Sequence, residues 1–271
     1  MFVKKKRRFW ECTGCRLQLI IPLPSDYELQ RYYCASYENG LYRTQLDTPL
    51  INERRAELRL QEILRFCRVG RWLDVGCSEG DFVATARRHG LHAEGIDLSE
   101  TAVARARAKG LPVTCSTVSD HHSPLLYETV TAFDVIEHVR DPLAFLTSIW
   151  GLLVPGGTVV LSAPDLSSLS RVVMRHRWYF YIPEEHLFYF RRDSLSRLLS
   201  RTRFEVIWAS ATSKYVSYSY ALDQFREYNP IIYSCLSKLS AVIPKSLRDL
   251  PLPFHLGELL IVARRRESDS L

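Results

Sequence analysis

The sequence predicts an α/β protein with a doubly wound, mostly parallel sheet of seven strands. Short apolar stretches alternate with helical patterns along the middle of the chain, which is typical of consecutive βαβ units. A loop bracketed by Gly76 and Gly80 joins one of these strands to the next helix. With 46% hydrophobic and 24% charged residues among 271, the composition is that of a globular chain with a sizeable core.

A helix precedes the first strand of this sheet. Thr48-Pro49 places a capping hydroxyl before a proline at the first helical position. Apolar residues then recur at helical spacing and predict an amphipathic helix over residues 49–67 that packs on the sheet; they are Ala56, Leu60, Ile63, Leu64 and Cys67. Residues 73–75 follow as a short buried strand that stops at a glycine.

The loop from Gly76 to Gly80 predicts a ligand site. A helix starts near Asp81 and Gly90 is placed to end it. A strand, a glycine loop and a helix N-terminus at the carboxyl edge of a sheet suit a nucleotide-like ligand. The loop lacks the lysine of a triphosphate loop and the three-glycine spacing of a dinucleotide loop, so neither ligand is favoured.

Asp97 ends the second strand, residues 91–98, and is a candidate ribose ligand. It lies about 20 residues after the glycine loop, the distance at which an acidic residue accepts hydrogen bonds from ribose hydroxyls. The alternative is a helix cap, a role that Ser99 would share. Beside the glycine loop, we favour the ribose role.

The rest of the sheet follows the same alternation. The expected order is helix 99–109, strand 113–115, strand 127–132, a helix from Asp141-Pro142, a turn at 155–157, strand 158–162, helix 194–199, strand 204–209 and strand 257–263. Residues 143–163 carry no charge and are long enough to imitate a membrane span. The Pro155-Gly156-Gly157 turn favours helix-turn-strand instead, so no transmembrane segment is expected.

Two parts lie outside this alternation, so we divide the chain into an extension, residues 1–48, and a main domain, residues 49–271. In the extension, Cys12-x-x-Cys15 supplies half of a tetrahedral zinc site and favours a local turn over bound metal. The tyrosine- and proline-rich residues 22–47 favour a cover over the core, with a substrate lid or a base-stacking surface as the alternatives. Residues 213–256 predict a helical insertion covering the site; an amphipathic membrane-surface helix is the alternative.

Charge and cysteine content limit the setting. Residues 1–24 lack the uninterrupted apolar stretch of a signal peptide, and the scattered cysteines suit reduced thiols, so we expect a cytoplasmic protein. The net charge of +6 permits contact with an anionic surface, including peripheral membrane contact, without requiring it.

Four motifs occur in order and carry a family resemblance. They are Leu73-Asp74-Val75-Gly76-Cys77-x-x-Gly80, Gly95-Ile96-Asp97, Phe133-Asp134-Val135-Ile136-Glu137-His138-Val139-x-Asp141-Pro142 and Leu153-x-Pro155-Gly156-Gly157. Together they resemble class I S-adenosylmethionine-dependent methyltransferases, within the small-molecule branch that includes the ubiquinone-pathway O-methyltransferases. The resemblance covers residues 49–210 and implies a Rossmann-like fold with an antiparallel last strand. The extension resembles a zinc-ribbon half whose upstream cysteine pair is missing.

The resemblance implies a cofactor, S-adenosylmethionine, and positions that hold it. The methionine part would lie against Asp74, Gly76, Cys77, Gly80, Ala132 and Phe133, and the ribose and adenine against Asp97, Leu98, Thr117 and Val118. The acidic residue usual in the family beside the adenine edge is absent at Thr117 and Val118. Carboxylates and an aromatic face suit a sulfonium cation, which agrees with this placement.

Two histidines are candidates for the base that takes a proton from the acceptor. An imidazole titrates near neutral pH, and His138 and His186 both belong to the region after the central strands. The alternative for each is a structural histidine. We expect His138 to be structural or to orient the cofactor.

Residues 164–190 follow the fifth strand and are expected to form the acceptor side. Aromatic residues mixed with arginines fit a ring-bearing, glycan-like or anionic lipid-linked acceptor, or else a plain hydrophobic lid with a basic rim. The aromatic residues are Trp178, Tyr179, Phe180, Tyr181, Phe188, Tyr189 and Phe190.

The sequence therefore predicts an S-adenosylmethionine-dependent methyltransferase that acts on a small-molecule, glycan or lipid-linked acceptor, at a hydroxyl oxygen. The alternative is an RNA-associated methyltransferase or an inactive nucleic-acid-binding protein that uses the basic residues 4–8. No recognisable RNA-binding motif accompanies them, so nucleic acid is disfavoured as a partner.

Overall fold

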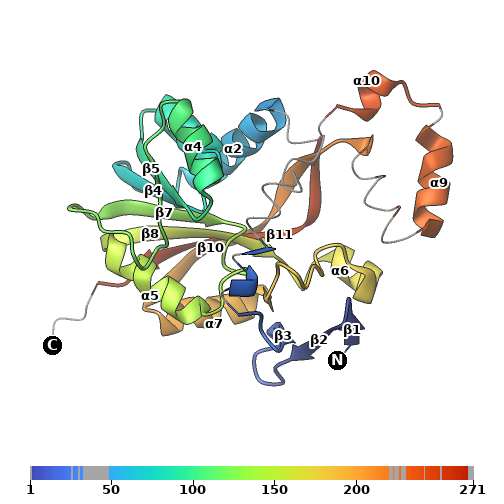
Figure 1. Ribbon diagram of the computed structural model, residues 1–271, viewed down its shortest axis with the longest axis horizontal. Coiled ribbons are helices and arrows are strands. Elements are labelled where there is room, and N and C mark those ends of the chain that lie inside the picture. The colour runs from blue at the N-terminus through green and yellow to red at the C-terminus, as the bar shows by residue number, and fades with distance from the viewer. Residues whose placement is uncertain are drawn as a thin grey trace.

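The computed structural model contains the predicted sheet, with the strand order β10-β11-β8-β7-β4-β5-β6 (Figure 1). Its strands are β4 (Arg71–Val75), β5 (His92–Asp97), β6 (Val113–Cys115), β7 (Tyr127–Phe133), β8 (Leu153–Pro164), β10 (Phe204–Val216) and β11 (Leu252–Arg265). Strands β4 to β8 pair in parallel, whereas β11 runs antiparallel to both β8 and β10. The fold class is therefore confirmed. The structure describes residues 2–25, 27–29, 31–32, 49–219, 222, 226, 230–240, 242–250 and 252–267.

Helices cover both faces of this sheet, as a doubly wound fold requires (Figure 1). One face packs on α2 (Pro49–Ile63), α3 (Asp81–Arg88) and α4 (Glu100–Ala108), and the other on α5 (Pro142–Leu152) and α7 (Arg192–Arg201). The predicted capping residues begin their helices: the Ser99 side chain accepts from Ala102 N, and Asp141 caps α5 ahead of Pro142. The capping role predicted for Thr48 lies outside the described residues.

Several predicted boundaries were wrong. β10 continues to Val216 and β11 begins at Leu252, so both ends of the helical insertion predicted for residues 213–256 are strand instead. The first helix ends at Ile63 rather than residue 67, because Ile63 is the last buried residue of its apolar stripe and Leu64 is 38% exposed. The turn at residues 155–157 lies inside β8, since Leu153 already pairs with Tyr127. Gly156, with φ +72°, takes up the irregularity there, where the register with β7 shifts.

The extension forms a second, small sheet with the order β1-β2-β3-β9. Its strands are β1 (Phe2–Lys4), β2 (Arg7–Glu11), β3 (Gln18–Ile21) and β9 (Phe188–Tyr189). β9 belongs to the predicted main domain and pairs with β3 through Gln18↔Tyr189 and Leu19↔Phe188. Cys12 and Cys15 lie on the predicted turn, between β2 and β3, where Arg16 N donates to Cys12 O. The zinc-ribbon likeness stays a prediction.

Two short helical regions lie near the ends of β8 and β10. α6 (Leu169–Met174) and the 3₁₀ turn η1 (Arg175–Arg177) follow β8, whereas α9 (Pro230–Ser240) and α10 (Lys245–Arg248) form the predicted insertion beyond the β10–β11 ribbon (Figure 1). α9 ends at Ser240, and Val242 beyond it is 77% exposed. In the described part of the chain, no helix combines the length and apolarity that crossing a bilayer requires.

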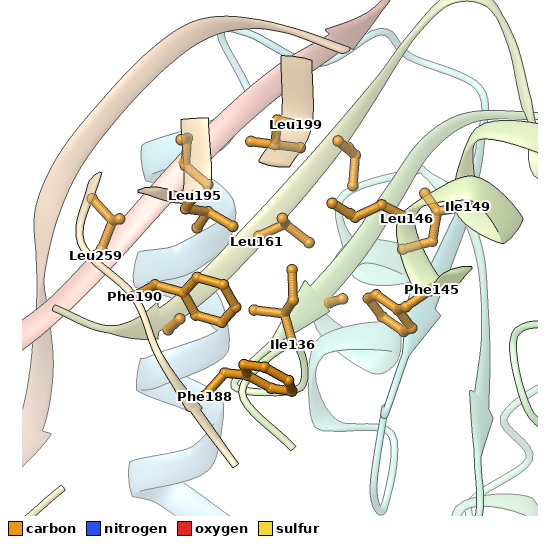
Figure 2. Close-up of a cluster of buried hydrophobic side chains, with 14 of the residues drawn as sticks. Ile136, Phe145, Leu146, Ile149, Leu161, Phe188, Phe190, Leu195, Leu199 and Leu259 are labelled. Atoms are coloured by element: carbon orange, nitrogen blue, oxygen red, sulfur yellow. The ribbon is translucent and has the colours of Figure 1, made fainter. Parts of the chain in front are cut away.

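Most rings of the expected acceptor segment belong to the core. Figure 2 shows Phe188 and Phe190 lying among Ile136, Leu161 and Leu195. Trp178 and Tyr181 are also almost fully buried, as is Tyr189. The interpretation of these residues as a plain hydrophobic cover therefore holds for five of the seven rings. Tyr179 and Phe180 are half-buried, and both pack against the core.

Candidate active site

The glycine loop leaves β4 at the carboxyl edge of the sheet in a conformation that disfavours side chains. Gly76 has φ +74°, and a Cβ there would lie 2.5 Å from Cγ2 of Val135. Gly80 has φ +80°, and a Cβ there would lie 2.7 Å from Cδ1 of Leu111. Since positive φ and close approach coincide at both positions, glycine is needed for the loop to close.

The Asp97 carboxylate joins the ends of β4 and β5. One oxygen accepts from Ser78 N and the other from Ser99 N, each at 2.8 Å. Burial raises the pKa of Asp97, while these backbone donors favour its charged form. Each carboxylate oxygen keeps a further lone pair for a hydroxyl donor. Ser99 is the helix cap and Asp97 accepts from its backbone N, so the capping alternative holds in part; the ribose role of Asp97 stays a prediction.

Asp74 and Cys77 lie buried beneath this loop. Thr131 Oγ1 donates to Asp74 Oδ1 at 2.7 Å. Burial raises the pKa of Asp74 to about 7, against the opposing effects of that hydrogen bond and of the Arg59 charge. The pKa of the Cys77 thiol is also raised, mainly by desolvation and further by the neighbouring carboxylates of Asp74 and Asp97. The thiol is therefore unreactive.

The other predicted cofactor contacts differ in surroundings. Leu98 is 65% exposed next to Asp97. Thr117 Oγ1 donates to Asp120 Oδ2 at 2.6 Å and accepts from Asp120 N, so its hydroxyl closes a local turn. Val118 is half-buried against the core. Ala132 and Phe133 pack into different core clusters, as successive strand residues do.

Arg59 lies at this edge of the sheet and was missed by sequence reasoning. Its guanidinium stands 4.5 Å from the ring centroid of Phe133. Arg59 Nη2 donates to Asp134 Oδ2 at 2.7 Å and to Glu258 Oε1 at 3.2 Å. The two carboxylates raise the pKa of Arg59 against the opposing effect of its burial. A signal existed, because position 59 falls on the apolar stripe of α2, where a charge is unusual.

His138 and His186 come together from distant parts of the chain. Their ring centroids are 4.8 Å apart and their planes are at 81°. His138 Nδ1 lies 3.0 Å from Glu185 O, and His186 Nδ1 lies 2.8 Å from Phe180 O. A carbonyl accepts only, so each Nδ1 carries the proton and each Nε2 of the neutral ring keeps a lone pair. This pairing favours, for each neutral ring, the tautomer in which Nε2 can act as a base.

Glu137 completes this cluster. Its carboxylate is 1% exposed, and its Oε1 lies 4.0 Å from His138 Nε2. Glu137 O accepts from Leu187 N and Phe188 N, which joins the loop after β7 to the start of β9. Ligand atoms of Glu137, His138 and His186 lie within 4.8 Å of one another. This oxygen and nitrogen set is of a kind that divalent cations accept, with each Nδ1 oriented by a carbonyl.

The segment that carries His138 begins beside the glycine loop. Val135, three residues before His138, is the side chain against which Gly76 packs. The segment that carries His138 therefore starts at the carboxyl edge of the sheet, beside the glycine loop, where doubly wound folds bind ligands.

Comparison with known proteins assigns this arrangement to a class. Residues 50–208 match the family model described as "Methyltransferase domain". The chain belongs to this family, and these residues form an S-adenosylmethionine-dependent methyltransferase domain.

Individual relatives are more distant. The ubiquinone biosynthesis O-methyltransferase of Vibrio vulnificus is 28% identical over 144 residues, 48% of this chain and 61% of that protein. Its counterpart in Aeromonas salmonicida is 35% identical over 112 residues, 38% of this chain and 47% of that protein. The chain thus spans about half to three fifths of these curated relatives.

A solved structure shows the same fold over nearly the whole chain. It is the 1,6-didemethyltoxoflavin-N1-methyltransferase of Burkholderia thailandensis, with S-adenosylhomocysteine bound. The TM-score is 0.56 at 17% identity, covering 98% of this chain and 99% of that one. Since its name describes methylation at nitrogen and those of the sequence relatives at oxygen, the fold leaves the acceptor atom open.

Proposed function

We propose that the protein transfers the methyl group of S-adenosylmethionine to a hydroxyl oxygen of a small-molecule, glycan or lipid-linked acceptor. The observation that carries this proposal is that Val135, three residues before the paired His138, lies against Gly76 of the glycine loop at the carboxyl edge of the sheet. The ubiquinone-pathway names of the sequence relatives support an O-linked acceptor. We place the reaction in the cytoplasm, since free thiols at Cys12 and Cys115 suit a reducing compartment.

In this proposal, the cofactor lies along the glycine loop with its ribose on Asp97. Asp74, Gly76, Cys77 and Gly80 surround its methionine part, with Phe133 and the backbone of Ala132 at the end of β7. Leu98 covers the adenine, and Thr117 and Val118 line its edge. We add Arg59, whose guanidinium lies over Phe133 and would balance the methionine carboxylate.

The cofactor supplies an activated methyl group, so the protein needs to orient the acceptor and remove its proton. We assign the proton to His186 Nε2. His186 is 6% exposed, and its Nδ1 faces the carbonyl of Phe180, so Nε2 is the nitrogen suited to accept a proton. His138, 4.8 Å away between ring centroids, would orient His186 or the cofactor.

Two measurements test this function. Calorimetric titration should show that S-adenosylmethionine binds the purified protein. Release of S-adenosylhomocysteine should then be measured with acceptors matched in skeleton but bearing a hydroxyl or an amine. Product from the hydroxyl series alone supports the proposal, whereas product from the amines alone contradicts methylation at oxygen. If the cofactor does not bind, the whole assignment fails.

A further inference from the structure

Helix α6 turns apolar side chains toward solvent. Leu169 is 78% exposed, Val172 55% and Val173 67%. Positions i, i+3 and i+4 lie on one side of a helix, so the three side chains form one patch rather than scattered contacts. Aliphatic patches of this kind on a protein surface mark places where something else binds.

Exposed cations flank this patch. Arg175 and Arg177 follow α6 directly, in η1. The turn between β1 and β2 adds Lys6. This turn lies near the end of η1, because Lys4 Nζ donates to Trp178 O at 3.4 Å. Lys5, in the same turn, pairs with Glu184 at 3.3 Å. Within the described part of the chain, Lys6, Arg175 and Arg177 form no ion pair. We name these six residues the α6 surface: Lys6, Leu169, Val172, Val173, Arg175 and Arg177.

We propose that the α6 surface docks on an anionic membrane. Aliphatic side chains enter the boundary between headgroups and acyl chains, while surrounding cations attract anionic lipids. A single-stranded nucleic acid would need aromatic faces on which its bases stack. The nearby rings of Trp178 and Tyr181 are buried, and Tyr179 and Phe180 pack half-buried against the core, so charge and side-chain type together favour lipid.

The α6 surface lies at the edge of the sheet that holds the candidate site, so docking there would bring the site to the membrane. α6 begins just after the carboxyl end of β8, the edge of the sheet that holds the candidate site. A membrane bound there would lie on the acceptor side. Docking itself does not depend on methyl transfer, but it deepens the proposed function by favouring a lipid-linked acceptor over a freely soluble one.

Sedimentation of the full chain with vesicles tests the proposal. The protein should bind vesicles of phosphatidylcholine with phosphatidylglycerol at least tenfold more tightly than vesicles of phosphatidylcholine alone. The double variant Val172→Glu/Val173→Glu should weaken that binding at least tenfold. Replacing Arg175 by glutamine should weaken it about fivefold, the equivalent of about 1 kcal/mol for a basic residue near the surface.

Val69→Glu is the matched control, because Val69 is 79% exposed before the amino end of β4, at the opposite edge of the sheet. It should bind anionic vesicles as the wild type does, and circular dichroism should show that all variants fold. The proposal is overturned if the wild type does not bind anionic vesicles at low salt. It is also overturned if the Val172→Glu/Val173→Glu variant binds them as tightly as Val69→Glu. RNA binding that the double variant loses in place of vesicle binding also overturns it. None of these outcomes affects the calorimetric titration with S-adenosylmethionine, so the proposed function is tested independently of membrane docking.

Discussion

The imidazole rings of His138 and His186 meet at 4.8 Å between centroids and 81° between planes, although one ring follows β7 and the other precedes β9. Each Nδ1 faces a backbone carbonyl, so Nε2 is the nitrogen of each ring that can act as the base. Our assignment of the base to His186 can therefore be tested against a neighbour in the same tautomer.

Replacing His186 by alanine should lower turnover about 100-fold and leave S-adenosylmethionine affinity nearly unchanged, because a general base acts in the chemical step. Steady-state kinetics and calorimetry measure the two quantities. His176→Ala is the matched control, since this histidine is exposed in the neighbouring η1. Full turnover in the His186 variant would leave His186 a structural role and move the base to His138.

Asp97→Ala should weaken S-adenosylmethionine binding by about 2 kcal/mol, because it removes a charged acceptor of ribose hydroxyls. The same carboxylate braces Ser78 N and Ser99 N. Asp97→Asn, which keeps one acceptor oxygen, should therefore recover part of the affinity. Equal calorimetric affinities for the wild type and Asp97→Ala would show that the ribose lies elsewhere.

Stability should fall with rising pH through the titration of Asp74. Burial raises its pKa from 3.8 to about 7, so the folded state holds this proton more tightly than the unfolded state does. The stability that Asp74 contributes is full below pH 3.8 and is lost as the pH rises toward 7. Urea unfolding across this range should show the decline in the wild type and a flatter profile in Asp74→Asn. Parallel profiles would mean that Asp74 ionises normally.

The ion-paired Arg59 should matter for stability. Arg59→Met leaves Glu258, which is 1% exposed, beside Asp134 without their shared cation. Breaking a buried ion pair from one side costs about 3 to 5 kcal/mol of unfolding free energy. Adding Glu258→Gln should recover part of the loss.

Arg65→Met is the control for Arg59, since Arg65 lies just beyond the end of α2 and its guanidinium stands over the ring of Phe66. Similar urea midpoints for Arg59→Met and Arg65→Met would show that the ion pair contributes little.

Purified protein should carry well under one zinc per chain. Cys12 and Cys15 lie together on the turn between β2 and β3, but they are two ligands where zinc takes four. Elemental analysis of protein purified without chelators measures the ratio. A value near one, lost in Cys12→Ser, would contradict this expectation and require two further ligands.

The parts of the fold and site that were predictable from the sequence are those set by neighbours along the chain. Gly76 and Asp97 lie at strand ends and Gly80 at a helix start, where spacing alone indicates a loop and an acceptor. The pairing of Arg59 with Glu258 was not predictable in the same way, because it depends on the antiparallel entry of β11 next to β8. Neither was the contact of His138 with His186, since it depends on how residues 178–187 turn before β9.

The aromatic segment was harder to interpret for a related reason. Tyrosine, tryptophan and phenylalanine suit a binding surface and a core equally well. What decides between these roles is the small sheet: Phe9, on β2, lies 5.1 Å from the Tyr181 ring and 5.4 Å from the Tyr189 ring. No local sequence pattern predicts that a strand near the start of the chain will pack on the rings of Tyr181 and Tyr189.

The pairing of β3 with β9 has a consequence for synthesis of the chain. Residues 18–21 leave the ribosome long before residues 188 and 189, their partners in the sheet. Until then β3 has an open edge, and Phe9 and Ile20 lack the rings that bury them. Long-range pairings of this kind form late and expose strands that aggregate. A nascent chain stalled before residue 188 should therefore depend on chaperones that bind its first strands.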